Sequence, residues 1–106
     1  MAGVIKGILQ EELENSLRMK STYEGELAKL PRGSLVRKTI KGLPYYYLVA
    51  REEGKVKFTY KGKASEADIK KYQEAKESRA RYRKLLSQAK KQIRFLRSSL
   101  RGKESV

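Results

Sequence analysis

The clearest property of this 106-residue sequence is what it lacks: it contains no cysteine, no histidine and no tryptophan, and only two prolines. Without cysteine the chain has no disulfides, no thiol nucleophile, no iron–sulfur centre and no common zinc-finger motif. Without histidine it lacks the side chain that most often serves as a general base or metal ligand at neutral pH. We therefore expect no enzymatic activity, no metal and no cofactor.

Long apolar runs are also missing. No stretch approaches the roughly 20 residues that cross a bilayer, and the segment before Glu11 is too short and interrupted for a secretory signal. A membrane-surface role for the C-terminal region, with Phe95, Leu96 and Leu100, is a weaker alternative because tryptophan is absent. We expect a soluble cytoplasmic protein without a membrane partner.

Positive charge is what the sequence has in excess. The chain contains 26 Lys and Arg against 12 Asp and Glu, which gives a formal charge of +14 and a pI of about 10.1. Residues 1–30 carry a net charge of −1, residues 31–63 carry +7 and residues 64–106 carry +8. No acidic residue occurs between Glu77 and Glu104. Charge concentrated in this way favours a polyanionic partner.

The first element that the sequence predicts is a helix over residues 4–30, ended by Pro31 and Gly33. Polar Ser16 and Lys20 weaken its apolar stripe, and Ile5, Ile8 and Leu17 widen it. The stripe recurs in steps of three and four residues and consists of Leu9, Leu13, Ser16, Lys20, Tyr23 and Leu27.

A second and longer helix is predicted over residues 65–101, with Ser65 as its N-cap and Glu66 and Asp68 in its first turn. It would be about 55 Å long at 1.5 Å per residue. Residues 102–106 are expected to form a frayed tail. Apolar residues follow the alternating 4,3 spacing of a coiled-coil seam, at Tyr82, Leu86, Ala89, Ile93, Leu96 and Leu100.

Between the helices, residues 34–62 favour a three-stranded antiparallel β-meander, because three runs rich in Val, Ile, Thr, Tyr and Phe are separated by turn sequences. A turn at Glu53–Gly54 would place Val49 opposite Phe58. A turn at Gly42–Leu43 would place Ile40 opposite Tyr45. One face is then expected to form the core, and it comprises Val36, Ile40, Tyr45, Tyr47, Val49, Val56, Phe58 and Tyr60.

The fold class that follows is α+β, with residues 1–106 as one domain: a long helix, the meander and a second long helix. We expect the two helices to pack as an antiparallel, coiled-coil-like hairpin. Because two helices alone leave much of each stripe uncovered, we also expect a homodimer formed through the helices.

The segment from Leu30 to Lys63 reads LPRGSLVRKTIKGLPYYYLVAREEGKVKFTYKGK. With its Gly-Ser-Leu, Tyr-Tyr-Tyr and Arg-Glu-Glu-Gly-Lys-Val-Lys elements, it resembles small uncharacterised basic proteins of bacteria and archaea, whose hairpin core is also flanked by charged helices. The hairpin is also similar to the opening segment of some transposases. The resemblance implies a helix-flanked meander and a setting in mobile elements or DNA maintenance, and it carries no established activity.

Nucleic-acid binding is the function that this charge pattern favours. Basic residues interleaved with tyrosine on a sheet supply phosphate contacts and stacking together, and an acid-free basic helix can follow a phosphate backbone. No sequence-reading motif is present, so we expect largely sequence-independent binding; DNA or RNA, and single or double strands, stay open. The predicted nucleic-acid-binding residues are Arg37, Lys38, Lys41, Tyr46, Lys55, Lys57, Lys61 and Lys63 of the meander and Arg81, Lys84, Lys91 and Arg94 of the second helix.

The alternative is a coiled-coil interaction or scaffold protein that dimerises and binds an acidic protein partner. In that interpretation Glu11, Glu14 and Glu24 of the first helix pair with arginines of the returning helix. Such pairing would neutralise part of the basic charge and leave the sheet as the binding surface.

Overall fold

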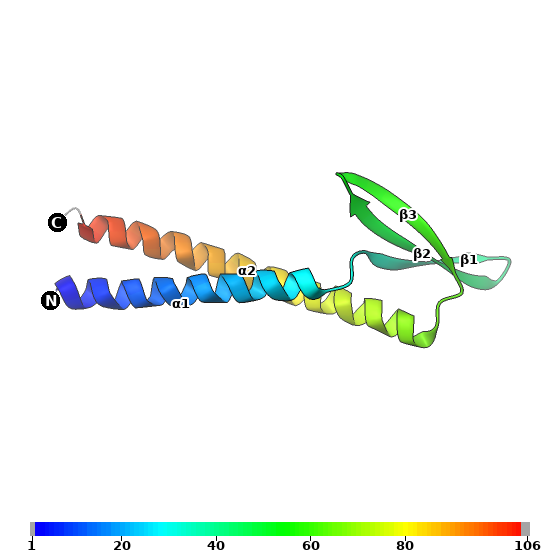
Figure 1. The fold of residues 1–106 in the computed structure, drawn as a ribbon, viewed down its shortest axis with the longest axis horizontal. Coiled ribbons are helices and arrows are strands. Elements are labelled where there is room, and N and C mark those ends of the chain that lie inside the picture. The colour runs from blue at the N-terminus through cyan, green and yellow to red at the C-terminus, as the bar shows by residue number, and fades with distance from the viewer. Residues whose placement is uncertain (1, 105–106) are drawn as a thin grey trace. The chain divides into compact units, whose positions relative to one another are not determined.

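The computed structural model describes residues 2–104 and contains two helices and one sheet (Figure 1). Helix α1 spans Ala2–Lys29, strands β1, β2 and β3 span Ser34–Ile40, Leu43–Glu52 and Lys55–Gly62, and helix α2 spans Glu66–Glu104. The α+β prediction is confirmed. Helix α2 runs past its expected end at Arg101 because a single glycine, Gly102, costs only about 1 kcal/mol inside a helix. Residues 105 and 106 of the expected tail lie outside the described residues.

Two compact units can be distinguished within the chain. The helical hairpin comprises residues 2–29 and 80–104, and the sheet unit comprises Leu30–Arg79. Helix α2 contributes its C-terminal half to the helical hairpin and its N-terminal half to the sheet unit.

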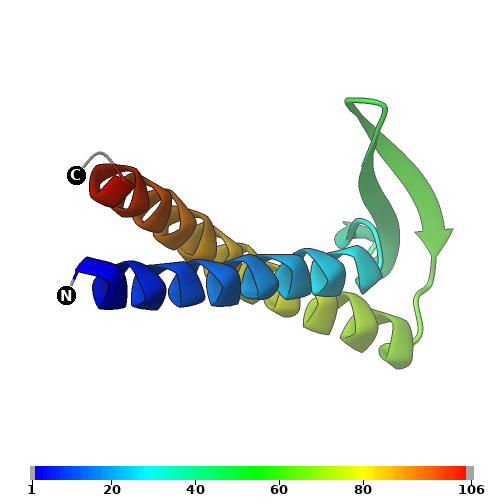
Figure 2. The ribbon, with the colours of Figure 1, turned by 60° about the vertical axis from the view of Figure 1, so that its left-hand side comes forward.

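In the helical hairpin, α1 and the C-terminal half of α2 run antiparallel (Figure 2), as the sequence predicts. Every residue of the two predicted stripes is buried or half-buried. The prediction fails for Ile5, Ile8 and Leu17, which are exposed. A contact between only two helices covers a narrow strip of each, and these three side chains lie off that strip. The core consists of Leu13, Ile93, Leu96 and Leu100, with Leu9 packed against it.

The most deeply buried side chain of the hairpin is Ser16, with 1% of its surface exposed. Tyr23 contacts Tyr82, their ring centroids 6.2 Å apart, and in an antiparallel pair this contact makes Ser16 level with Ala89. Ala89 is 2% exposed. Two small side chains at one level allow the helix backbones to approach closely, so the position that weakens the stripe in the sequence is deeply buried in the hairpin.

In the sheet unit the strand order is β1-β2-β3, with both pairs antiparallel. The predicted β2–β3 register is confirmed, since Val49 lies opposite Phe58. The predicted β1–β2 register is wrong by two residues, and Ile40 lies opposite Leu43. The turn is formed by Lys41 and Gly42, which have φ of 52° and 79°, the left-handed pair typical of a two-residue hairpin turn. A two-residue shift keeps every side chain on its predicted face.

Two hydrogen bonds stabilise the ends of the sheet unit. The Asp68 backbone N–H donates a hydrogen bond to Ser65 Oγ at 3.1 Å, which confirms Ser65 as the N-cap of α2. The Arg79 guanidinium donates a hydrogen bond to the Pro31 carbonyl oxygen at 2.7 Å. The second bond connects α2 at Arg79 to the segment that leads into β1, within the sheet unit.

Within residues 2–104, neither helix combines the length and the apolar character that crossing a membrane requires.

Candidate nucleic-acid interface

A groove of about 350 Å³ on the helical hairpin gathers positively charged side chains. Five of the six side chains that line it are cationic. Helix α1 supplies one of these residues and the C-terminal half of α2 supplies the others. We call this site the basic groove, and its residues are Lys20, Lys90, Ile93, Arg94, Arg97 and Arg101.

The spacing of α2 explains why these cations gather. Each groove cation of α2 follows a buried seam residue by one position, as Lys90 follows Ala89 and Arg94 follows Ile93. Because the seam recurs in steps of four and three, the residues that follow it form a parallel stripe along its border. This offset is visible in the sequence and could have identified the groove. Of the predicted helix residues only Arg94 lies in it, whereas Lys90, Arg97 and Arg101 were missed.

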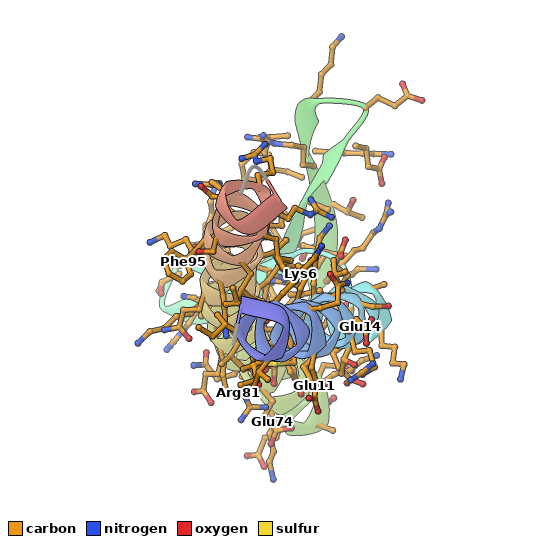
Figure 3. The ribbon with its side chains drawn as sticks, turned by 90° about the vertical axis from the view of Figure 1, so that its left-hand side faces the viewer. Lys6, Glu11, Glu14, Glu74, Arg81 and Phe95 are labelled. Carbon is orange, nitrogen blue, oxygen red and sulfur yellow. The ribbon has the colours of Figure 1, made fainter. Side chains whose placement is uncertain are left out.

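The glutamates of α1 do not neutralise the groove by pairing across the hairpin. Glu24 pairs with Lys20 of its own helix, at 3.9 Å between Nζ and Oε1, and Glu11 and Glu14 point away from the C-terminal half of α2 (Figure 3). The predicted pairing of these glutamates with the returning helix is therefore wrong. The pairs Lys29–Glu26, Lys57–Glu52 and Lys70–Glu74 are also local, within one helix or across one strand turn.

The other predicted cations of α2 lie outside the groove. Lys84 and Lys91, seven residues apart, share the outer side of the helix near Phe95, which points away from α1 (Figure 3). The Arg81 guanidinium lies over the ring of Tyr82, 5.1 Å from its centroid. All three cations are exposed, and none of them lines the basic groove.

Only some of the predicted binding residues of the sheet lie near Tyr46. Arg37 lies directly opposite half-buried Tyr46 on the β1–β2 ladder. Lys57 lies opposite Ala50, four residues farther along β2, and pairs with Glu52 at 3.6 Å. These side chains share one face of the sheet, the basic face, but do not surround the tyrosine.

A β-bulge near the end of β3 involves Lys61, one of the predicted binding residues. In the register Tyr46 pairs with Gly62 and Tyr47 with Tyr60, so Lys61 is the extra residue. Lys61 and Lys63 line a small hollow of about 180 Å³ together with Leu35, Ala64, Asp68, Lys71 and Tyr72. The start of α2 thus lies on the same side of the sheet as the basic face.

The three remaining predicted lysines lie apart from one another, although Lys55 lines a hollow together with Lys57, Arg32 and Arg51. Lys38 points to the opposite face, where its Nζ lies 5.1 Å from the centroid of the Tyr47 ring. Lys41 lies in the β1–β2 turn and Lys55 at the β2–β3 turn, at opposite ends of the sheet. Within residues 3–102, no group of three or more carboxylates is placed to hold a metal ion.

The sheet face that the sequence predicts as core is open. In the sheet unit one short helical segment, the start of α2, lies beside the sheet. It lies on the side of the basic face. Six residues of the opposite face are exposed: Val36, Ile40, Leu43, Val56, Phe58 and Tyr60. Together with half-buried Tyr45, Tyr47 and Val49, they form what we call the aromatic face.

A family model described as "Domain of unknown function (DUF6788)" matches residues 8–71, which is more than half of the chain, so the chain belongs to that family. The matched segment contains the whole aromatic face but not the α2 side of the basic groove. No curated protein and no solved structure matches the chain.

Proposed function

We propose that this DUF6788 chain is a non-enzymatic nucleic-acid-binding protein of the cytoplasm that binds largely independently of base sequence. The observation that carries the proposal is the basic groove, in which five cations from two helices line one hollow. Lysine and arginine side chains gathered in this way displace counterions from a phosphate backbone, which is the main source of sequence-independent affinity.

The length of the groove favours a polymer over a small anion. Lys90 and Arg101 are eleven residues apart on α2, which corresponds to about 16 Å along the helix axis. A row of cations of that length can contact several successive phosphates. Arg94 and Arg97 can each donate two parallel hydrogen bonds to one phosphate, which fixes the backbone in the groove.

The basic face of the sheet supplies a second set of phosphate contacts. Arg37, beside Tyr46, and Lys61 and Lys63, near the start of α2, are exposed cations that a nucleic-acid backbone could reach. Neither the basic groove nor the basic face carries a known motif for contacting the edges of bases. Phosphate contacts position a nucleic acid without reading its sequence.

The second candidate function is a scaffold that dimerises through its helices and binds an acidic protein. The observation in its favour is the exposed apolar group Val4, Ile5 and Ile8 in the first turns of α1. A second helical hairpin packed on these side chains would cover them. Sedimentation velocity without nucleic acid separates the two functions, because the scaffold requires a stable dimer and nucleic-acid binding does not.

The test of nucleic-acid binding is a salt titration with labelled duplexes of about 20 base pairs, both DNA and RNA. We compare the native chain with the triple variant Lys90→Gln, Arg94→Gln, Arg97→Gln. The triple variant is expected to lose at least about tenfold in affinity at low salt. Its slope of log affinity against log salt should fall by about 2 to 3, because each phosphate contact contributes about 0.9.

The matched control removes the same charge elsewhere: Arg18→Gln, Lys29→Gln, Lys70→Gln, three exposed helix positions outside both basic surfaces. This control should keep the native slope. If the two triple variants behave alike, binding reflects net charge and not the basic groove. If the native chain binds no nucleic acid at low salt, single-stranded or duplex, the proposal is wrong.

A further inference from the structure

The aromatic face leaves several large apolar side chains exposed to water. Val56 is 55% exposed, Phe58 is 59% exposed and Tyr60 is 58% exposed, all on the edge strand β3. The six exposed side chains of the face are each between 37% and 59% exposed, and exposed apolar patches of this kind mark binding sites.

Aromatic rings are the distinctive component of this face. The Tyr60 ring lies 5.3 Å from the Tyr47 ring and 6.4 Å from the Tyr45 ring, centroid to centroid. Phe58 lies two residues from Tyr60 on β3, so the two rings point to the same side about 6.7 Å apart along the strand. Phe58 and Tyr60 are therefore two neighbouring, exposed rings on a strand that is hydrogen-bonded to β2.

The charges on the aromatic face indicate which class of molecule it can bind. Its charged positions are Lys38, beside the Tyr47 ring, and Arg51, which lies opposite Val56 at the other end of the sheet. No carboxylate occupies a position on this face of the described strands, because Glu52 belongs to the opposite face and Glu53 to the turn. A second copy of this chain would bring like charges to both ends of the contact. The complementary occupant is anionic and carries flat apolar rings.

We propose that the aromatic face binds single-stranded nucleic acid by stacking bases on Phe58 and Tyr60, with Lys38 and Arg51 contacting the phosphates. This proposal rests on the proposed function and specifies one of its ligands. A single strand exposes the faces of its bases and can stack them on protein rings, whereas a duplex keeps them inside its own stack. Duplex binding therefore belongs to the basic groove, and single-strand binding adds the aromatic face.

The experiment measures the affinities of a labelled 12-nucleotide oligothymidylate and of the duplex used above, for the native chain and for Phe58→Leu and Tyr60→Leu. Leucine keeps an apolar side chain and removes the ring. Each variant is expected to bind oligothymidylate at least about fivefold more weakly, because stacking on one ring contributes that much or more. Affinity for the duplex should be unchanged.

Two controls secure the comparison. Phe58→Tyr keeps a ring and should keep the native single-strand affinity, and Val56→Leu changes the same strand without touching a ring. Since the chain has seven tyrosines and no tryptophan, tyrosine fluorescence gives an independent readout. Oligothymidylate should quench the emission of the native chain and quench it less in Tyr60→Leu.

The outcomes separate this proposal from the broader one. If the leucine variants bind oligothymidylate as the native chain does while the triple groove variant loses duplex binding, the stacking proposal is overturned and the proposed function stands. If the leucine variants weaken duplex and single strand equally, the aromatic face is not selective and stacking is again overturned. A native dimer that Phe58→Asp dissociates would assign the face to a second copy instead. Absence of binding to every nucleic acid overturns both proposals.

Discussion

Replacing Leu96 by alanine is expected to lower the free energy of unfolding of the helical hairpin by about 2–4 kcal/mol. Leu96 is 4% exposed and packs in a small hydrophobic cluster with Leu13, Ile93 and Leu100. Truncating a buried leucine removes its transfer free energy and leaves a cavity that the surroundings fill only in part. Since domains of this size are stable by about 5–15 kcal/mol, the loss is a large fraction of the total. Urea unfolding followed by circular dichroism measures it.

The neighbouring residue provides the control. Phe95 is 67% exposed and points away from α1 (Figure 3), so Phe95→Ala should change the free energy of unfolding by no more than about 0.5 kcal/mol, although it removes a larger side chain. If Phe95→Ala costs as much as Leu96→Ala, the outer side of α2 is covered in solution. That result would favour a dimer formed through the helices.

The second large effect is expected at Gly33, where alanine should cost about 2–4 kcal/mol. Gly33 has φ of +89°, in the left-handed region that side chains disfavour, and an added Cβ would lie 2.7 Å from the Val49 carbonyl oxygen. Backbone strain and a collision with β2 therefore act together. Thermal or urea unfolding of Gly33→Ala gives the magnitude.

Gly54→Ala separates these two causes. Gly54 has φ of +77°, but an added Cβ there meets no heavy atom within 4 Å. Only the conformational cost applies, so Gly54→Ala should lose about 1–2 kcal/mol, less than Gly33→Ala. Equal losses at the two positions would show that β2 moves aside and that the contact with Val49 contributes nothing.

The helices could be predicted from the sequence because the spacing of apolar residues along the chain determines them. The seam from Tyr82 to Leu100 is spaced for a helix that packs along one side, and both helices bury that stripe. The β2–β3 register could also be predicted, since Glu53–Gly54 forms the two-residue turn that the sequence indicates. At the opposite end of the sheet, Lys41–Gly42 forms a turn of the same kind, but the Leu-Pro dipeptide that follows it obscures it in the sequence.

The candidate site was less predictable because it depends on which surfaces the fold covers. Alternation correctly assigns Phe58 and Tyr60 to one face of the sheet, but it cannot show that α2 begins on the other side. Apolar residues on one face normally indicate a core, and here they stay open. The basic groove is hard to predict for a different reason: Lys90, Arg97 and Arg101 belong to the C-terminal half of α2, which is positively charged throughout, and only their one-residue offset from the seam distinguishes them.

The one-residue offset between seam and groove also has a thermodynamic consequence. Cations that recur at three- and four-residue intervals along α2 repel one another, at a cost of a few tenths of a kcal/mol per pair. The folded hairpin therefore carries a self-repulsion that the unfolded chain largely escapes. Added salt screens this repulsion. On the proposed function a bound polyanion would cancel it too, so nucleic-acid binding and folding would be thermodynamically linked, with the unbound protein the less stable form.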